Sequence, residues 1–379
     1  MDARTLRWTD GSWSSPLPDW DGERTLVVAL GSRASADDGR WPLRLREAYP
    51  HALITGCSTA GHLDDGHVDD GLTATIVRFA STDLVSAAVE LRAERSFDDG
   101  RALADALVAD MAAPRLVVAL SDGVAVNGGQ LVAGLAAGLP AGTTVFGGLA
   151  GDGDRFEQTW TLVGDRPVAG HAVVVALGGG SLSVGLGSRG GWRTFGPERR
   201  ITRAKGNVLF ELDGEPALDL YRHYLGHRAG ELPASALLLP LSVRNDADDP
   251  NPVVRTVLGI DTDERSLTFA ADIPEGGLGQ LMWVTVDGLV GGAGDAAAAA
   301  MRSLGGGDEP VLALGVSCIG RRLVLGRRVE DEVDAVAEVL PPGSHHVGFY
   351  AYGEISPLAD GRCGLHNQTM TLAVLAERD

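Results

Sequence analysis

The sequence has few cysteines, a deficit of basic residues and no long hydrophobic run, and each lack excludes a class of protein. Three cysteines in 379 residues, Cys57, Cys318 and Cys363, are too few and too scattered for a disulfide framework or a zinc knuckle. The 32 basic residues against 51 acidic ones leave a net charge of −19, which repels nucleic acid and anionic lipid surfaces. No apolar run reaches the roughly 20 residues that cross a bilayer.

The N-terminal residues carry no hydrophobic region of the kind that a signal peptide needs. Together with the charge and the scarce cysteines, this predicts a soluble, cytoplasmic protein. We expect it to bind neither nucleic acid nor a membrane.

What the sequence does contain is 44% hydrophobic residues and 52 glycines, enough for a large core with many tight strand-to-loop junctions. Short apolar runs predict buried strands, and three of them precede a helix and a second strand. These strand pairs are 26–30 with 52–55, 116–120 with 143–146, and 311–316 with 346–350. A glycine follows each second strand, at Gly56, Gly147 and Gly353. The chain is therefore predicted to be an α/β protein with mixed β-sheets and flanking helices in two domains.

Whether the three strand–helix–strand units are internal repeats is left open, because their sequences share little identity. Residues 1–24 show no periodicity and are predicted to form an irregular N-terminal arm. The segment 213–216 (DGEP) is typical of a helix start, with a capping carboxylate and a proline in the first turn. We place the domain boundary there, which gives a first domain at 25–212 and a second at 213–379.

Polar and aromatic residues gather where the predicted strands end. Segment 349–357 (FYAYGEISP) and segment 366–369 (HNQT) combine aromatic rings, a carboxylate, an imidazole and amides. That mixture is typical of a site for a small polar molecule. Because equivalent strands end at one edge of a sheet, we predict a single cleft there. Its candidate contacts from strand ends and loops are Cys57, Ser58, Gly147, Gly148, Phe349, Tyr352, Glu354, His366 and Asn367.

Arginines are the candidate carboxylate ligands, because they are scarce and can clamp a carboxylate with two hydrogen bonds. Arg203, with Asn207 nearby, precedes a short apolar run, and Arg255 lies inside an apolar strand. For an amino-acid-like ligand, Arg203 or Arg255 would hold the carboxylate and Glu354 the amino group. Tyr352 and Phe349 would contact an apolar portion, while Asn367 and His366 would donate hydrogen bonds.

Catalytic and metal-binding alternatives have weaker support. Cys57 and Cys318 follow strands, as a nucleophile would, but no histidine pairs with either in the sequence. We interpret both as buried packing residues and expect no enzyme, with a cysteine-dependent hydrolase or transferase as the alternative. The nine histidines show no chelating spacing, so no metal site is predicted. The glycines at 147–153 lack the lysine and serine or threonine of a phosphate loop.

Several motifs, in the same order along the chain, resemble those of the FIST family. The N-terminal FIST domain is matched by 56–61 (GCSTAG) and 146–153 (FGGLAGDG), with Phe156 and Thr159. The C-terminal FIST domain is matched by 211–217 (ELDGEPA), 317–322 (SCIGRR), 348–355 (GFYAYGEI) and 366–369 (HNQT). The chain departs from the family where Gly61 is followed by His62, because family members usually have a glutamate there.

The resemblance implies a sensory protein that binds a small ligand such as an amino acid, and not an enzyme. Some family members bind haem and sense nitric oxide, which leaves a haem sensor as a further alternative, although we expect no cofactor. No kinase or cyclase region is recognisable in the sequence, so we expect the signal to pass to a separate protein such as a kinase.

Overall fold

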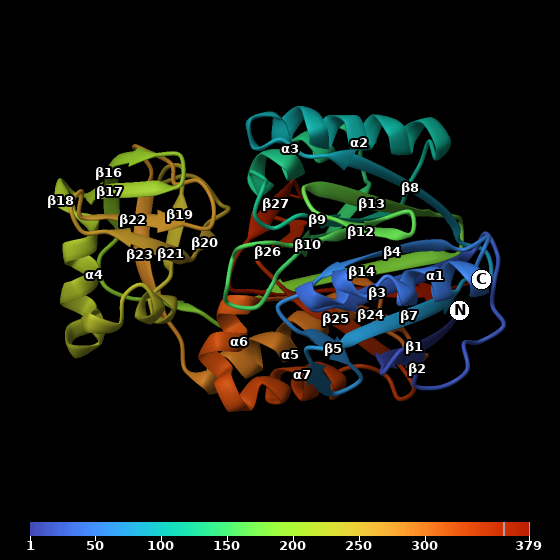
Figure 1. Ribbon diagram of the computed structural model, residues 1–379. Helices are drawn as coiled ribbons and strands as arrows, with labels where there is room; N and C mark the ends of the chain where they lie inside the picture. The colour runs from blue at the N-terminus through green and yellow to red at the C-terminus, as the bar shows by residue number, and fades with distance from the viewer. Residues whose placement is uncertain (359–360, 379) are drawn as a thin grey trace.

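The computed structural model describes residues 1–358 and 361–378, which form a large body and a smaller lobe (Figure 1). The lobe (residues 193–285) lies to the left in Figure 1 and connects to the body after β14 (Leu182–Arg189) and before α5 (Val286–Ser303). Three mixed sheets form the body, with helices above and below them. The predicted α/β class with mixed sheets and flanking helices is confirmed. None of the helices within these described residues is long and apolar enough to span a membrane.

Each body sheet takes strands from distant parts of the chain. Sheet 1 has the order β12 (Arg166–Val168), β11 (Thr161–Val163), β4 (Leu53–Ser58), β3 (Thr25–Gly31), β7 (Leu72–Arg78), β1 (Asp2–Thr9) and β2 (Ser12–Trp13). Sheet 2 has the order β27 (Cys363–His366), β26 (Gly353–Pro357), β10 (Thr144–Leu149), β9 (Leu116–Ser121), β13 (His171–Gly178) and β8 (Asp83–Glu90). Sheet 3 has the order β14, β28 (Met370–Glu377), β24 (Leu312–Cys318), β25 (His345–Ala351), β5 (His62–Asp64) and β6 (His67–Asp69).

The three sheets share one topology, so the strand–helix–strand units are structural repeats. In each sheet two central strands are parallel, namely β3 with β4, β9 with β10, and β24 with β25. A later strand, β7, β13 or β28, runs antiparallel to the first of each pair. Each unit then sends its hairpin to another sheet: β5–β6 joins β25, β11–β12 joins β4, and β26–β27 joins β10.

A glycine at the same register position of each parallel pair permits the two strands to approach. Gly56, Gly147 and Gly348 lie opposite residues 29, 119 and 315 of the neighbouring strand. An added Cβ at any of the three would lie 1.9 Å from the carbonyl oxygen of that neighbour. The third repeat glycine is therefore Gly348, and the prediction of Gly353 was wrong by five residues.

The inner faces of the three sheets enclose a common apolar core. Its central strands contribute Leu26, Leu30, Leu116, Leu120, Leu312 and Val316. A small apolar cavity of about 40 Å³ remains in this core, lined by Leu26, Leu30, Leu120 and Val316 among others. The alternate residues point outward, as a strand's two-residue period requires.

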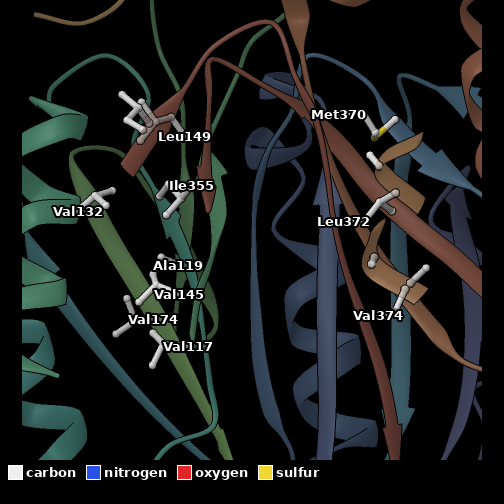
Figure 2. Packing of buried hydrophobic residues seen from close by; sticks show 14 of the residues in the cluster. Val117, Ala119, Val132, Val145, Leu149, Val174, Ile355, Met370, Leu372 and Val374 are labelled. Carbon is white, nitrogen blue, oxygen red and sulfur yellow. The ribbon is translucent and has the colours of Figure 1, made fainter. Parts of the chain in front are cut away.

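Helices cover the outward faces. Outer residues such as Val117 and Val145 pack on the side of α3, near Val132, while Met370, Leu372 and Val374 lie on β28 (Figure 2). The helices of the body are α1 (Arg40–Ala48), α2 (Ser96–Asp110), α3 (Gly128–Gly138), α5, α6 (Ile319–Leu325) and α7 (Val329–Ala337), with short 3₁₀ turns η1 (Arg33–Asp37), η2 (Ala93–Arg95) and η5 (Gly326–Arg328).

The N-terminal segment is not the irregular arm that the sequence predicted. β1 pairs antiparallel with β7 from Asp2 to Trp8 and extends sheet 1. Only Leu6 of this strand is fully buried, so its apolar alternation is too weak to reveal a strand in the sequence. The irregular stretch is limited to the residues between β2 and β3.

The lobe is built from short antiparallel strands around its own core, which includes Leu209, Tyr221 and Phe269. Its strands are β15 (Arg193–Thr194), β16 (Arg199–Lys205), β17 (Val208–Leu212), β18 (Glu215–Pro216), β19 (Leu241–Arg244), β20 (Val253–Arg255), β21 (Val257–Asp261), β22 (Ser266–Phe269) and β23 (Leu278–Trp283), and its helical segments are α4 (Ala217–Leu225), η3 (Gly226–Glu231) and η4 (Ala234–Leu238). The sequence boundary at 212 and 213 falls inside this lobe. In space, the chain after residue 285 returns to the body.

We predict that Gly56→Ala destabilises the body by about 1–3 kcal/mol or more, because the new methyl group would overlap the Ala29 carbonyl oxygen. Gly180→Ala is the matched control, since a Cβ at Gly180 meets no atom within 4 Å. Unfolding in denaturant, followed by circular dichroism, measures both variants. Equal stability of the two variants would contradict the close-approach role of Gly56.

Candidate functional site

The three strand ends that the sequence predicted to meet do lie together, and main-chain hydrogen bonds join them in a ring. The amides of Gly151, Tyr352 and Ala60 donate to the carbonyl oxygens of Ser58, Leu149 and Tyr350, at 3.0, 3.0 and 2.9 Å respectively. Each bond links one repeat to another. The ring therefore fixes the end of the body at which the three units converge.

The five candidate contacts nearest this ring do not line the cleft between lobe and body. Cys57 and Phe349 point into the apolar core between the sheets. The Ser58 hydroxyl accepts a hydrogen bond from the main-chain N–H of Trp160 at 3.0 Å. Gly147 and Gly148 are buried strand residues that face neighbouring backbone and side chains. We assign these five candidate contacts to the architecture of the site and not to its surface.

Two further candidates, Arg203 and Asn207, lie in the lobe on and beside β16. Arg203 is half-exposed, pairs with Glu211 and Glu264 at 3.4 and 3.7 Å, and lies over the ring of Phe210. The Asn207 amide donates to the carbonyl oxygen of Phe269 at 2.8 Å. The structure does not bring these two residues to the strand ends.

The remaining polar candidates do gather, around the buried carboxyl group of Glu354. Glu354 lies opposite Gly148 on one side and His366 on the other, in the middle of the β10–β26–β27 ladder. Both the amide and the hydroxyl of Thr369 donate to its Oε1 at 2.7 Å. Burial raises the pKa of Glu354 to about 8, against the lowering effect of these hydrogen bonds. The group is therefore mostly protonated at neutral pH.

Unpaired polar atoms are concentrated next to this carboxyl group. Within residues 1–358 and 361–378, six buried atoms between positions 354 and 368 have no hydrogen-bond partner. They are Oε2 of Glu354, Oγ of Ser356, and both amide atoms of Asn367 and Gln368. Leaving one buried polar group unpaired costs about 1–3 kcal/mol, so such a concentration is expected where a ligand supplies the partners.

Arg255 reaches this group of residues from the lobe. Its Nη1 donates to the carbonyl oxygen of Leu365, which precedes His366, at 3.2 Å. It also lines a cleft of about 300 Å³ between lobe and body, together with Arg244, Asp249 and Leu358. Burial lowers the pKa of Arg255 to about 10, which leaves it charged at neutral pH. The structure thus brings Arg255, His366, Asn367 and Glu354 to one junction.

Tyr352 supports a neighbouring loop. Its hydroxyl hydrogen-bonds to the buried carboxylate of Asp152, and its ring stacks on Phe156 with centroids 4.2 Å apart. Asp152 also accepts from the amides of Phe156, Glu157 and Gln158 at 2.9–3.1 Å. Tyr352 therefore orders the loop from 152 to 158, a role that the sequence did not indicate.

A buried ion pair links the site to the lobe, and sequence reasoning missed it. Arg321 and Glu332 are fully buried, 2.7 Å apart. Arg321 also donates to the carbonyl oxygens of Gly190, on the chain that enters the lobe, and of Leu289, in the first turn of α5 after the lobe. Next to them, the indole of Trp192 donates to the main-chain oxygen of Gln368 at 2.9 Å. The only sequence signal was the paired arginine after the strand that ends at Cys318.

Comparison with known protein families identifies the family of the chain. The FIST N domain matches residues 25–215, and the FIST C domain matches residues 217–357. The chain belongs to the FIST family. FIST domains are known as sensory domains that bind small ligands, so a sensory, ligand-binding role is supported for this FIST protein.

No curated protein matches the chain. Among solved structures, the crystal structure of cyanuric acid hydrolase from A. caulinodans covers 93% of this chain and 90% of its own, with 10% identity and a TM-score of 0.39. A similarity this distant carries no argument about the chemistry of the FIST protein.

The alternative chemistries depend on the two cysteines and on a histidine. Cys57 and Cys318 are buried, and burial raises the pKa of both thiols well above its usual range, away from the thiolate that a nucleophile needs. His366 uses Nε2 to contact the carbonyl oxygen of Ser356 at 3.2 Å. The haem alternative stays a prediction.

The raised pKa of Glu354 predicts how stability depends on pH. Between about pH 4.5 and pH 8 the unfolded chain releases the Glu354 proton while the folded protein keeps it, so stability falls as pH rises through this window. The slope is at most about 1.4 kcal/mol per pH unit. The Glu354→Gln variant should lack this pH-dependent part of the free energy of unfolding, and its stability should equal that of the wild type near pH 4.5. Denaturant unfolding measures the free energy of unfolding of both proteins from pH 5 to pH 9. If the difference between wild type and variant does not change with pH, the raised pKa of Glu354 is contradicted.

Proposed function

We propose that this FIST protein is a sensor for a small amino-acid-like zwitterion, which binds where the lobe meets the body. The observation that carries the proposal is the group of unpaired buried polar atoms around Glu354, with the cationic Arg255 beside it. A cation on one side and an acidic group on the other match the two charges of an amino acid. The neighbouring cleft of about 300 Å³ lies in the size range of small-ligand sites.

Each polar residue has a role in this proposal. Arg255 holds the ligand carboxylate through Nη2, which has no hydrogen bond among the described residues. Glu354 accepts the ligand ammonium group through the unpaired Oε2. The amides of Asn367 and Gln368 complete the hydrogen bonds and thereby set the orientation of the ligand.

The signal leaves through the lobe and a separate partner protein such as a kinase. Gln368 contributes unpaired amide atoms to the site, and its main-chain oxygen holds Trp192 on the chain that enters the lobe. Arg255 belongs to the lobe itself. A ligand that bridges Arg255 and Glu354 therefore stabilises one orientation of the lobe relative to the body, by its differential affinity for that orientation.

We predict that one or more of the twenty common amino acids raises the melting temperature of the purified protein, and that Arg255→Ala weakens this ligand at least tenfold. The reason is the loss of a charge-assisted hydrogen-bond pair. Arg203→Ala is the matched control, because Arg203 makes its ion pairs within the lobe. Thermal shift identifies the ligand and calorimetry measures its affinity. A tenfold loss in both variants, or no response to any amino acid, would contradict the proposal.

Binding of an ammonium group should also expel the Glu354 proton. At pH 7 a group with a pKa of about 8 is about nine-tenths protonated, and a bound cation favours the ionised form. Calorimetry in phosphate and in Tris should then show release of up to about one proton per ligand, and affinity should rise from pH 6 to pH 8. Glu354→Gln should bind at least several-fold more weakly and release no proton. Proton release that persists in this variant would exclude Glu354 as the ammonium partner.

A further inference from the structure

A second hollow lies at the end of the body where the three repeats converge, and it shares no lining residue with the Arg255 cleft. It has a volume of about 550 Å³, within the range of small-ligand pockets. The loops after three repeat strands line it, with Ser32 and Arg33 from the first unit, Asp152–Arg155 from the second, and Ile319 and Arg322 from the third. Its position is therefore a product of the whole body and not of one loop.

Three arginines border this hollow, and two of them are already held in place. Arg322 forms two hydrogen bonds with Asp70, at 2.7 and 2.9 Å, and lies over the ring of Tyr350. Arg33 donates to Asp37 at 2.8 Å and to Gln158 at 2.9 Å. Fixed guanidinium groups lose little freedom when an anion binds, which favours binding.

Arg155 is the arginine with hydrogen-bonding capacity to spare. Among the described residues it has one charge contact, with Asp152 at 3.8 Å, and its side chain is 53% exposed. Asp152 already accepts hydrogen bonds from three amides and from Tyr352, so its charge is largely satisfied without Arg155. Asp154 is the remaining acidic residue on this rim, and it is exposed to solvent.

The loop that carries Arg155 is strained. Phe156 has a φ of +56°, a conformation that bulky residues rarely adopt, and it is held there by Tyr352 and Asp152. Backbone strain of this kind costs about 1–3 kcal/mol and is concentrated at ligand sites. Holding the loop in this shape keeps Arg155 at the rim of the hollow.

The part of the lining that α6 and the start of α7 contribute includes three apolar side chains. These are Ile319, Leu323 and Val329, and Leu323 is 45% exposed although it is a large hydrophobic residue. A ligand that covers this part would remove apolar surface from water. A hollow lined by arginines and by an exposed leucine matches a molecule with an anionic head and a short apolar body.

We propose that this hollow is a second ligand site, for a small organic anion whose carboxylate or phosphate head contacts Arg155, Arg33 and Arg322 and whose apolar body lies on Leu323. The site is separate from the zwitterion site and does not depend on it. Hexanoate and hexyl phosphate represent the two possible heads, and inorganic phosphate represents a head without an apolar body.

Calorimetry on the full chain at constant ionic strength tests the site. At least one of the two hexyl anions should bind, and inorganic phosphate should bind at least fivefold more weakly than hexyl phosphate. Arg155→Ala should weaken the hexyl anion at least fivefold. Arg166→Ala is the matched control, because Arg166 is 85% exposed with a similar loose contact to Asp165 at 3.9 Å. It should change the affinity less than twofold.

A second pair of variants tests the apolar contact. Leu323→Ser should weaken hexyl anions but not inorganic phosphate, whereas Leu43→Ser, at a leucine 62% exposed on α1, should change neither. Arg255→Ala should leave hexyl binding intact, which separates this site from the zwitterion site. The absence of binding by both hexyl anions, or an equal loss in Arg155→Ala and Arg166→Ala, would overturn the proposal.

Discussion

The exchange of hairpins among the three sheets is the constraint on which the rest of the structure depends. The hairpin of each repeat unit pairs with a strand of another unit, so no unit forms a sheet from its own strands alone. The exchange carries Glu354, which the third unit contributes, into sheet 2, where its carboxyl group meets Thr369 at the edge of sheet 3. A buried acidic group between two sheets thus follows from chain topology. The ring of main-chain hydrogen bonds at the strand ends then fixes the relative positions of the three units.

The same exchange creates three equivalent positions with different chemistry. In each sheet, one residue of the exchanged hairpin pairs with the residue that follows Gly56, Gly147 or Gly348. These hairpin residues are Thr161, Glu354 and His62 respectively, and all three are fully buried. Thr161 is satisfied by the carbonyl oxygen of His171 at 3.2 Å. His62 has no partner on either ring nitrogen among the described residues, and burial lowers its pKa. Among the described residues of these three positions, Glu354 alone combines a titratable acid with neighbouring unpaired amides, so the three equivalent positions have diverged in chemistry. His62 is also the residue at which the sequence departs from the family motif.

The sequence predicted the features that depend on the local pattern of residues. It did not predict those that depend on pairing between distant segments of the chain. Short apolar runs predicted the parallel strand pairs. The position of Gly56 and Gly147 at the end of such a run predicted them as the glycines of the first two units. The third glycine was misplaced because Gly353 begins the exchanged hairpin, whereas Gly348 lies unmarked inside an apolar strand. Arg203 and Arg255 are both arginines in short strands, and only the fold distinguishes the one that reaches Leu365. The N-terminal strand was missed because most of one face is exposed. The position of the 193–285 lobe is a matter of tertiary structure, since the chain on both sides of it belongs to the body.

Burial raises the pKa of Glu354, and the pairing of Arg321 with Glu332 explains why no nearby cation offsets that effect fully. Two buried carboxyl groups, Glu332 and Glu354, lie within the influence of this one guanidinium. Arg321 is committed to Glu332, which also accepts from Ser317 and from Tyr350 at 3.1 and 2.6 Å. A buried ion pair with all its hydrogen bonds made is costly to break, by about 3–5 kcal/mol. Glu354 is left without a cation of its own and holds its proton. Because Arg321 also donates to Gly190 on the chain that enters the lobe and to Leu289 in the first turn of α5, the guanidinium that is committed to Glu332 contacts the chain on both sides of the lobe that carries Arg255.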